Sequence, residues 1–223
     1  MEKYAVIVAG GTGSRMQSNL PKQFLSLGGK PVLYYSISAF LHAFEDINII
    51  VVLPAEQLSN GEKIINEHFP RRNIRLTTGG QARFHSVQKG LEKVPDACIV
   101  FIHDAVRCMV TTALIQRCYE GAIINGSAIP VIIPRDSLRL ISDFGSEILD
   151  RYAVRIVQTP QAFNSTDLKK AFLQDYKPAF TDEATVAETA GMHIELIEGE
   201  ENNLKITYPE DMAFAEVILK SRS

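Results

Sequence analysis

The sequence predicts an α/β fold in which a doubly wound, mostly parallel β-sheet carries helices on both faces. Two observations lead to this prediction. Apolar runs of strand length alternate along the chain with segments of helical length. The runs are rich in Val and Ile and lack the polar–apolar alternation of a half-exposed strand, which indicates burial on both faces. We expect residues 1–223 to form a single domain.

Each element follows from its segment of sequence. The expected strands cover residues 4–9, 47–54, 74–78, 98–103 and 127–134. The expected helices cover residues 32–42, 61–68, 82–93 and 111–125. Ligands of such sheets bind beyond the carboxyl ends of the strands. The loops after the first and fourth strands are therefore expected to share one edge of the sheet.

Residues 137–150 interrupt this rhythm. Two short apolar runs flank a turn-rich centre at residues 142–146, which predicts a β-hairpin inserted in the domain. An isolated hairpin is marginally stable in water, so we expect this one to be a dimerisation arm that reaches to a second subunit. Beyond it, residues 156–161 resemble a strand that runs into a loop, and helices are expected to begin near Thr181 and Thr207, the latter with Glu210 in a capping box.

Composition excludes several classes of function. The net charge of -3 argues against a nucleic-acid partner, which would need basic patches. No apolar run approaches the ~20 residues of a membrane span, and no signal-peptide pattern is present. The three cysteines form no Cys-x-x-Cys pair, so we expect neither a zinc site nor a disulfide framework, and Cys98 is expected in the core. A cytoplasmic location is the simplest expectation.

The loop after the first strand carries the strongest chemical signal. Three glycines, Gly10, Gly11 and Gly13, allow a tight turn that exposes N–H groups to an anion, and Arg15 and Lys22 add two cations. A dinucleotide fingerprint would need a third glycine where Met16 stands, and no Gly-Lys-Ser/Thr of a P-loop follows. The pattern Gly-x-Gly-x-Arg-Met with a later Pro-Lys-Gln is typical of enzymes that transfer a nucleoside monophosphate.

An ordered set of motifs extends this signal over the chain. They are residues 9–16, 21–23, 79–80, 83, 86, 103–105, 107, 150–151, 158–161, 181–184 and 203–207. Over residues 5–215 the chain resembles the 2-C-methyl-D-erythritol 4-phosphate cytidylyltransferase family of the non-mevalonate isoprenoid pathway. The resemblance implies a Rossmann-like nucleotidyltransferase fold and a homodimer. It also implies transfer of CMP from CTP to a sugar-alcohol phosphate with release of pyrophosphate, with Mg²⁺ held mainly by the CTP phosphates and no metal ligand from the protein.

The resemblance also implies roles for individual residues. The catalytic residues would be Arg15, Lys22, Arg151 and Lys205. The cytidine triphosphate would be framed by Ala9, Gly10, Gly11, Gly13, Gly80, Arg83 and Ser86. The acceptor would contact Asp104, Arg107, Thr159 and, from the arm of a neighbouring subunit, Ser137. The chain departs from the family pattern at Ser14, Gln81, Cys108 and Ser137, where a basic residue, an acidic residue, proline and threonine are common.

Several of these residues have structural alternatives. Arg151 is also a reasonable cation at a hairpin end, and Lys205 a lysine that protects a sheet edge. A structural role in capping a helix is the alternative for three acidic residues, because their type and position suit it: Asp104, Asp182 and Glu183.

Three other functions fit part of the sequence. A ribitol-5-phosphate cytidylyltransferase shares the chemistry but uses another acceptor. A non-catalytic nucleotide-binding module would keep the fold without Arg15, Lys22 or Lys205, which are all present. A redox enzyme is the weakest alternative, because this chain has Met16 where the dinucleotide fingerprint needs a third glycine.

Overall fold

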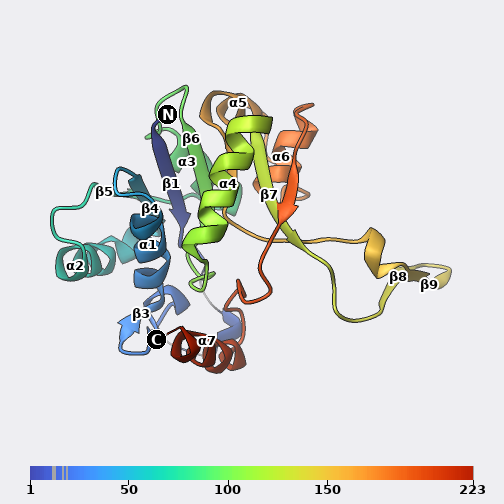
Figure 1. Cartoon of the computed structure of the whole chain (residues 1–223), viewed down its shortest axis with the longest axis horizontal. Helices are drawn as coiled ribbons and strands as arrows, with labels where there is room; N and C mark the ends of the chain where they lie inside the picture. Colours follow the sequence, from blue (N-terminus) through green and yellow to red (C-terminus); the bar gives the residue numbers. More distant parts are fainter. Residues whose placement is uncertain (12–13, 17, 19, 223) are drawn as a thin grey trace.

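The computed structural model of the protein describes residues 1–11, 14–16, 18 and 20–222. These residues form an eight-stranded sheet (Figure 1) with the order β10-β7-β11-β6-β1-β4-β5, and β12 pairs with β7. The strands of the sheet are β1 Lys3–Val8, β4 Asn48–Leu53, β5 Ile74–Thr78, β6 Ile99–Asp104, β7 Ser127–Ile132, β10 Ile156–Val157, β11 Gln161–Asn164 and β12 Leu196–Glu198. The α/β fold is confirmed, and all five predicted strands are present to within two residues at each end.

The sheet is mostly parallel, as predicted, with two short antiparallel strands, β10 and β11. Strand β1 pairs in parallel with β4 and β6, and β4 with β5. Strand β11 enters antiparallel between β6 and β7. Strand β10 precedes it and pairs antiparallel with the other end of β7. The segment predicted as one strand running into a loop therefore holds β10 and, after a break at residues 158–160, the first residue of β11. At the start of this break the Gln158 N–H still donates to the Pro130 carbonyl of β7 at 2.8 Å.

The helices of the described residues are α1 Val32–Ala43, α2 Leu58–His68, α3 Arg83–Leu91, α4 Thr112–Asn125, α5 Ser165–Ala171, α6 Glu183–Thr189 and α7 Pro209–Ser221. All of them except α7 belong to two layers that cover the faces of the sheet. One core cluster joins α1, α2 and α4 to one face of the sheet, and a second joins α3, α5 and α6 to the other. Cys98 belongs to the second cluster, as expected. Single-turn 3₁₀ helices cover Ser14–Met16, Lys22–Phe24, Ala55–Gln57 and Arg151–Ala153.

The predicted helix over 61–68 begins earlier, at Leu58, because the turn Ala55–Gln57 leads directly into it. The predicted capping box of Thr207 and Glu210 is wrong. Pro209 occupies the first helical position of α7, and Asp211 Oδ2 accepts from the backbone N–H groups of Thr207 and Tyr208 at 2.7 and 2.8 Å. Asp211 lies one position further from Thr207 than Glu210 does, and its carboxylate reaches both groups.

A third cluster of buried side chains packs α7 beside the carboxyl edge of the sheet. It includes Met16, Leu27 of β2 Ser26–Leu27, Val106, Ile206 and Ala215 of α7. Strand β2 pairs with β3 Lys30–Pro31 in a separate small sheet. The cluster holds the loop after β1, the loop after β6 and the segment before α7 at the same edge of the sheet.

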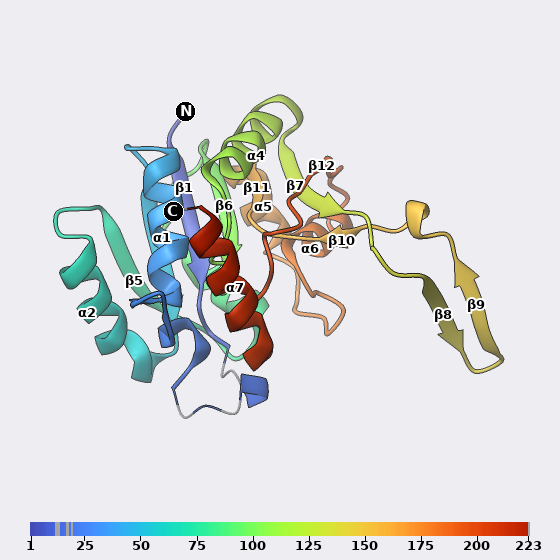
Figure 2. The same cartoon turned by 60° about the horizontal axis from the view of Figure 1, so that its bottom comes forward.

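The predicted hairpin is present as β8 Leu138–Ser142 and β9 Gly145–Leu149. Figure 2 shows it standing away from the body of the domain. Its apolar side chains are exposed, including Ile141, Phe144 and Ile148. Among the described residues, no helix is both long and apolar enough to cross a membrane.

Candidate functional site

A cleft of about 280 Å³ opens at the carboxyl edge of β1 and β6. Four segments far apart in the sequence form its walls, namely the loop after β1, the turn that leads into α3, the end of β6 with the loop after it, and the segment before α7. It is lined by Val8, Ala9, Gly10, Gly11, Arg15, Lys22, Gln23, Gly80, Gln81, Ala82, Arg83, Ser86, Asp104, Val106 and Lys205. Ten sequence-predicted site residues lie in this set, so the structure brings them together. Gly13 lies outside the described residues.

Two of the segments that line the first cleft, the loop after β1 and the turn that leads into α3, are each held by a side-chain hydrogen bond. Gln23 donates from Nε2 to the Ala9 carbonyl at 2.8 Å, and Ser86 Oγ accepts from the Gly80 N–H at 3.1 Å. Position 80 requires glycine because His85 lies so close to its backbone that a Cβ there would collide with Cβ of His85. Both segments line the cleft at Ala9 and Gly80.

Lys22 is nearly buried, and its ammonium reaches the segment before α7. Its Nζ donates to the Ile206 carbonyl at 2.9 Å. Burial, followed by the neighbouring charges of Lys205 and Arg15, lowers the pKa of Lys22 below its ordinary value. Arg15 lies on the same side, with its guanidinium 5.5 Å from the centre of the Tyr208 ring. Three cations thus share a small volume, which suits a bound polyanion.

A second cleft of about 210 Å³ adjoins the first. It is lined by Arg83, Asp104, Arg107, Val157, Gln158, Thr159, Gln161, Thr181, Asp182 and Lys205. Arg83, Asp104 and Lys205 line both clefts. The two spaces therefore meet at these three side chains, and a ligand in one would lie against a ligand in the other.

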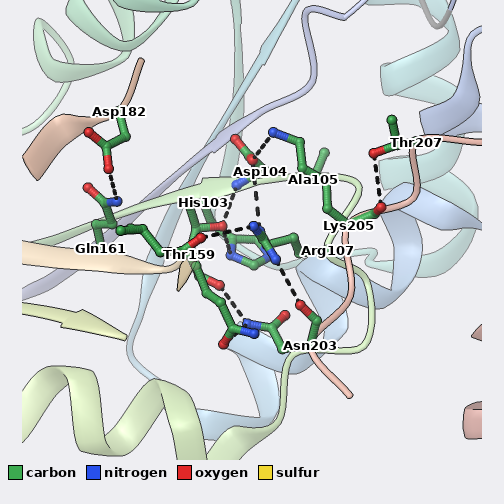
Figure 3. Close-up of polar contacts among 12 residues, drawn as sticks. His103, Asp104, Ala105, Arg107, Thr159, Gln161, Asp182, Asn203, Lys205 and Thr207 are labelled. Carbon is green, nitrogen blue, oxygen red and sulfur yellow. Dashed lines mark hydrogen bonds and ion pairs between the residues drawn. The ribbon is translucent and has the colours of Figure 1, made fainter. Parts of the chain in front are cut away.

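Asp104, at the end of β6, holds this junction together. Its Oδ2 is 2.8 Å from Lys205 Nζ, and its Oδ1 accepts from Arg83 Nε at 3.1 Å (Figure 3). Arg107 Nε lies 4.0 Å from Oδ2. Burial raises the pKa of Asp104, but Arg83, Lys205 and Arg107 lower it by more, so the pKa stays well below the usual range. Asp104 is thus a permanent anion that orients cations, and the helix-capping alternative is wrong.

The residues of the second cleft are aligned by contacts that sequence reasoning missed. Thr159 Oγ1 accepts from the Asp104 N–H at 3.0 Å and lies 3.1 Å from His103 Nδ1. Asn203 is fully buried; its Nδ2 donates to the Thr159 carbonyl at 2.9 Å, and its own carbonyl accepts from Arg107 at 2.8 Å (Figure 3). The sequence held a signal for this residue, because Asn203 opens the same motif that contains Lys205.

Asp182 caps α6 as predicted, accepting from the Thr185 N–H at 2.9 Å. Glu183 does not cap a helix. Its carboxylate is buried and paired with Arg83. A pair separated by a hundred residues leaves no local signal in the sequence.

The arm residues lie away from both clefts of their own chain. Ser137 is exposed at the start of the arm. Arg151, just beyond the arm, donates from Nη1 to the Arg135 carbonyl at 2.8 Å and lies 5.0 Å from the Tyr152 ring centre. Within one chain, these two side chains are not brought to the cluster of site residues.

The donor set of the clefts suits phosphate better than a bare metal ion. Asp104 is the carboxylate of the first cleft in the part of the chain that the structure describes, and it is already engaged by two cations. Those same residues contain no group of three or more His, Cys, Asp or Glu side chains placed to hold a metal. Cys98, Cys108 and Cys118 are buried and free.

Comparison with known proteins identifies a family. The family model described as 2-C-methyl-D-erythritol 4-phosphate cytidylyltransferase matches residues 4–221. The protein of that name from Bacteroides fragilis is 43% identical over 220 residues, which cover 98% of this chain and all of the relative.

Solved structures agree with the sequence comparison. The enzyme of that name from Thermus thermophilus superposes with a TM-score of 0.78 at 29% identity, covering 99% of this chain and 100% of that one. The 4-diphosphocytidyl-2C-methyl-D-erythritol synthase from Anaerococcus prevotii has a TM-score of 0.85 at 25% identity, covering 98% of this chain and 96% of that one.

Proposed function

The chain belongs to the 2-C-methyl-D-erythritol 4-phosphate cytidylyltransferase family, and from this premise we propose how its own residues carry out the reaction. The protein is a CTP-dependent cytidylyltransferase that transfers CMP from CTP to 2-C-methyl-D-erythritol 4-phosphate. The observation that carries the proposal is the meeting of two clefts at Arg83, Asp104 and Lys205. A nucleotide in the first cleft and an acceptor in the second would have their phosphates beside the same cations.

The chemistry requires no general base. The acceptor phosphate is a monoester with a second pKa of ~6, so it is largely a dianion at neutral pH. One of its oxygens attacks the α-phosphorus of CTP in line. The bond from that phosphorus to the oxygen bridging the α- and β-phosphates breaks, and pyrophosphate leaves. What the protein must supply is alignment of two polyanions and stabilisation of the charge that develops between them.

Arg15 and Lys22 are assigned to the α-phosphate, because they lie on the nucleotide side of the junction. Ala9, Gly10, Gly11, Gly13, Gly80, Arg83 and Ser86 are assigned to the rest of the nucleotide. The acceptor is assigned to Asp104, Arg107 and Thr159, which line the second cleft, with Lys205 between the two ligands.

Mg²⁺ would be held mainly by the CTP phosphates. A cleft whose described lining offers several cations and a single, already paired carboxylate fits this arrangement. When bound, the ion neutralises part of the triphosphate charge.

The arm is assigned to a twofold dimer. Its exposed Ile141, Phe144 and Ile148 suit a protein partner better than water. Ser137 and Arg151, which lie away from the clefts of their own chain, would then act at the neighbouring subunit's acceptor cleft. The free, buried cysteines support a reducing compartment, and we place the dimer in the cytoplasm.

The function is tested by pyrophosphate release with CTP, ATP, GTP or UTP against methylerythritol phosphate or ribitol 5-phosphate. We expect rapid release only with CTP and methylerythritol phosphate. Faster pyrophosphate release with ribitol 5-phosphate would show that ribitol 5-phosphate is the acceptor. No release with any pair of substrates would favour a nucleotide-binding module.

Replacing Lys205 by alanine is expected to raise the KM for the acceptor about tenfold to a hundredfold and to lower turnover. The reason is loss of a charge-assisted phosphate contact, which is worth roughly 1.5–3 kcal/mol. Steady-state kinetics with varied acceptor at saturating CTP measures it. Lys220→Ala, an exposed lysine of α7, is the matched control. A change confined to the KM for CTP contradicts the assignment.

A further inference from the structure

Glu183 is a buried carboxylate that contacts the site through Arg83. It is the first residue of α6 and is 1% exposed. It lines neither cleft, so no substrate is expected to contact it. Its partner, Arg83, lines both. The proposed reaction assigns no role to the Glu183 carboxylate.

The contact between Arg83 and Glu183 consists of two hydrogen bonds, both donated by Arg83. Arg83 Nη1 donates to Glu183 Oε1, and Nη2 donates to Oε2 at 3.0 Å. A fork-to-fork pair of this kind fixes the plane of a guanidinium as well as its position. A third donor of Arg83, Nε, goes to Asp104 at 3.1 Å. Two of the five N–H groups of an arginine then remain for a ligand.

The platform that carries Glu183 is rigid. Gln161 of β11 accepts at Oε1 from the Ala184 N–H at 2.8 Å and donates from Nε2 to Asp182 at 2.9 Å. The apolar residues Ala184 and Ala187 of the same helix are buried in the second core cluster. The start of α6 is thus tied to the sheet by Gln161, while the carboxylate of Glu183 is held by Arg83.

Stability alone is a weak reason for this pair. Taking two charges out of water costs about as much as their attraction returns, and apolar side chains of similar volume often serve stability better. Such a pair does, however, hold a charged group in one orientation. Burial raises the pKa of Glu183 above its ordinary value, although Arg83 offsets part of this rise. Glu183 and Asp104 together raise the pKa of Arg83 against the opposing effect of burial. Arg83 therefore remains a cation in this wall.

We propose that Glu183 is a positioning residue, which holds the Arg83 guanidinium, and through it Asp104, in the orientation that both substrates require. The inference rests on the proposed function, because it assigns the two clefts to the nucleotide and the acceptor. Glu183 acts before any ligand arrives, by removing the freedom of a long side chain that binding would otherwise have to restrict.

The test begins with Glu183→Gln, which keeps the shape but sets an amide N–H₂ against the Arg83 donors. We expect the KM for CTP and the KM for the acceptor to rise about tenfold, with kcat changing less than about threefold. A purely structural residue would instead lower the melting temperature and the active fraction, hence the apparent kcat, and leave both KM values unchanged. That second pattern would overturn the proposal. Glu188→Gln, exposed on the same helix, is the matched control.

A double-mutant cycle tests whether Glu183 acts through Arg83. In an Arg83→Gln background, Glu183→Gln is expected to add no further rise in either KM. Independent, multiplicative effects would contradict the proposal. The double variant also removes both buried charges together, so it is expected to fold where a single variant does not. Glu183→Asp, which keeps the charge, should restore part of the loss.

Calorimetric titration with CTP separates this inference from the proposed function. The CTP dissociation constant is expected to rise about tenfold in Glu183→Gln whether or not turnover is measured. An inactive wild-type protein would sink the proposed function. An active wild-type protein whose CTP affinity and KM values do not respond to Glu183→Gln would sink only the positioning role.

Discussion

Replacing Lys22 by alanine is expected to lower kcat about a hundredfold to a thousandfold, and Arg15→Ala should act similarly. Both cations are assigned to the α-phosphate, where charge develops as the new bond forms. Loss of one preorganised donor of this kind costs roughly 3–4 kcal/mol in the transition state. Affinity for CTP should weaken less, because the glycine loop and the remaining cations still hold the triphosphate. Pyrophosphate release and calorimetric titration measure the two effects separately.

The control for this prediction is Lys63→Ala, an exposed lysine of α2 far along the chain from the loop. It removes the same charge without touching the cleft and should leave kcat unchanged. Near-normal turnover in both the Arg15 and the Lys22 variants would remove the two residues from the chemistry. A loss of CTP binding as large as the loss of turnover would make them binding groups only.

Deleting residues 138–149 and closing the gap with a short glycine bridge is expected to give a monomer with little activity. The deleted segment carries the exposed apolar side chains of the arm, and the core clusters of the domain do not include it. The body should therefore fold and still bind CTP, while acceptor use falls because a monomer has no neighbouring subunit to bring Ser137 and Arg151 to its cleft. Light scattering and steady-state kinetics measure the two consequences. A deletion variant that is fully active, or an intact protein that is already monomeric, would contradict the shared site.

Complementation between two inactive variants tests the shared site without altering the fold. Lys22→Ala disables a cleft, and Arg151→Ala disables an arm. If the arm acts across the dimer, a mixed dimer contains one complete site, formed by the cleft of the Arg151→Ala subunit and the arm of the Lys22→Ala subunit. Mixing equal amounts after subunit exchange should recover about a quarter of wild-type activity, as random twofold pairing requires. If Arg151 serves its own subunit, mixing restores nothing.

The sequence predicted what is local or periodic. Continuous Val and Ile runs located the central strands, because burial on both faces leaves no polar position in them. The glycine loop and Asp104 follow β1 and β6, and parallel strands bring such ends to one edge. Pairing between distant segments was not predictable in the same way. Strand β11 inserts antiparallel between β6 and β7 through a four-residue run, too short to show its partners.

The site residues that were missed have the same explanation. Glu183 was interpreted as a helix-capping residue because its neighbours fit that role, and its true partner is Arg83 on another helix. Asn203 acts through Thr159 and Arg107, which are distant in sequence and meet only in the folded chain. Charged and amide side chains can serve many purposes locally, so tertiary contacts decide among them.

The measurement that tests the central claim most directly follows the atoms of the acceptor phosphate. The acceptor is prepared with ¹⁸O in the terminal oxygens of its phosphate and incubated with CTP and the enzyme. If the acceptor phosphate attacks the α-phosphorus, ³¹P spectra of the product show an isotope shift on both phosphorus signals, since the bridging oxygen carries the label, and the pyrophosphate is unlabelled. A product in which the phosphorus from CTP shows no shift, or a labelled pyrophosphate, would contradict in-line attack by the acceptor phosphate and the assignment of the cationic junction with it.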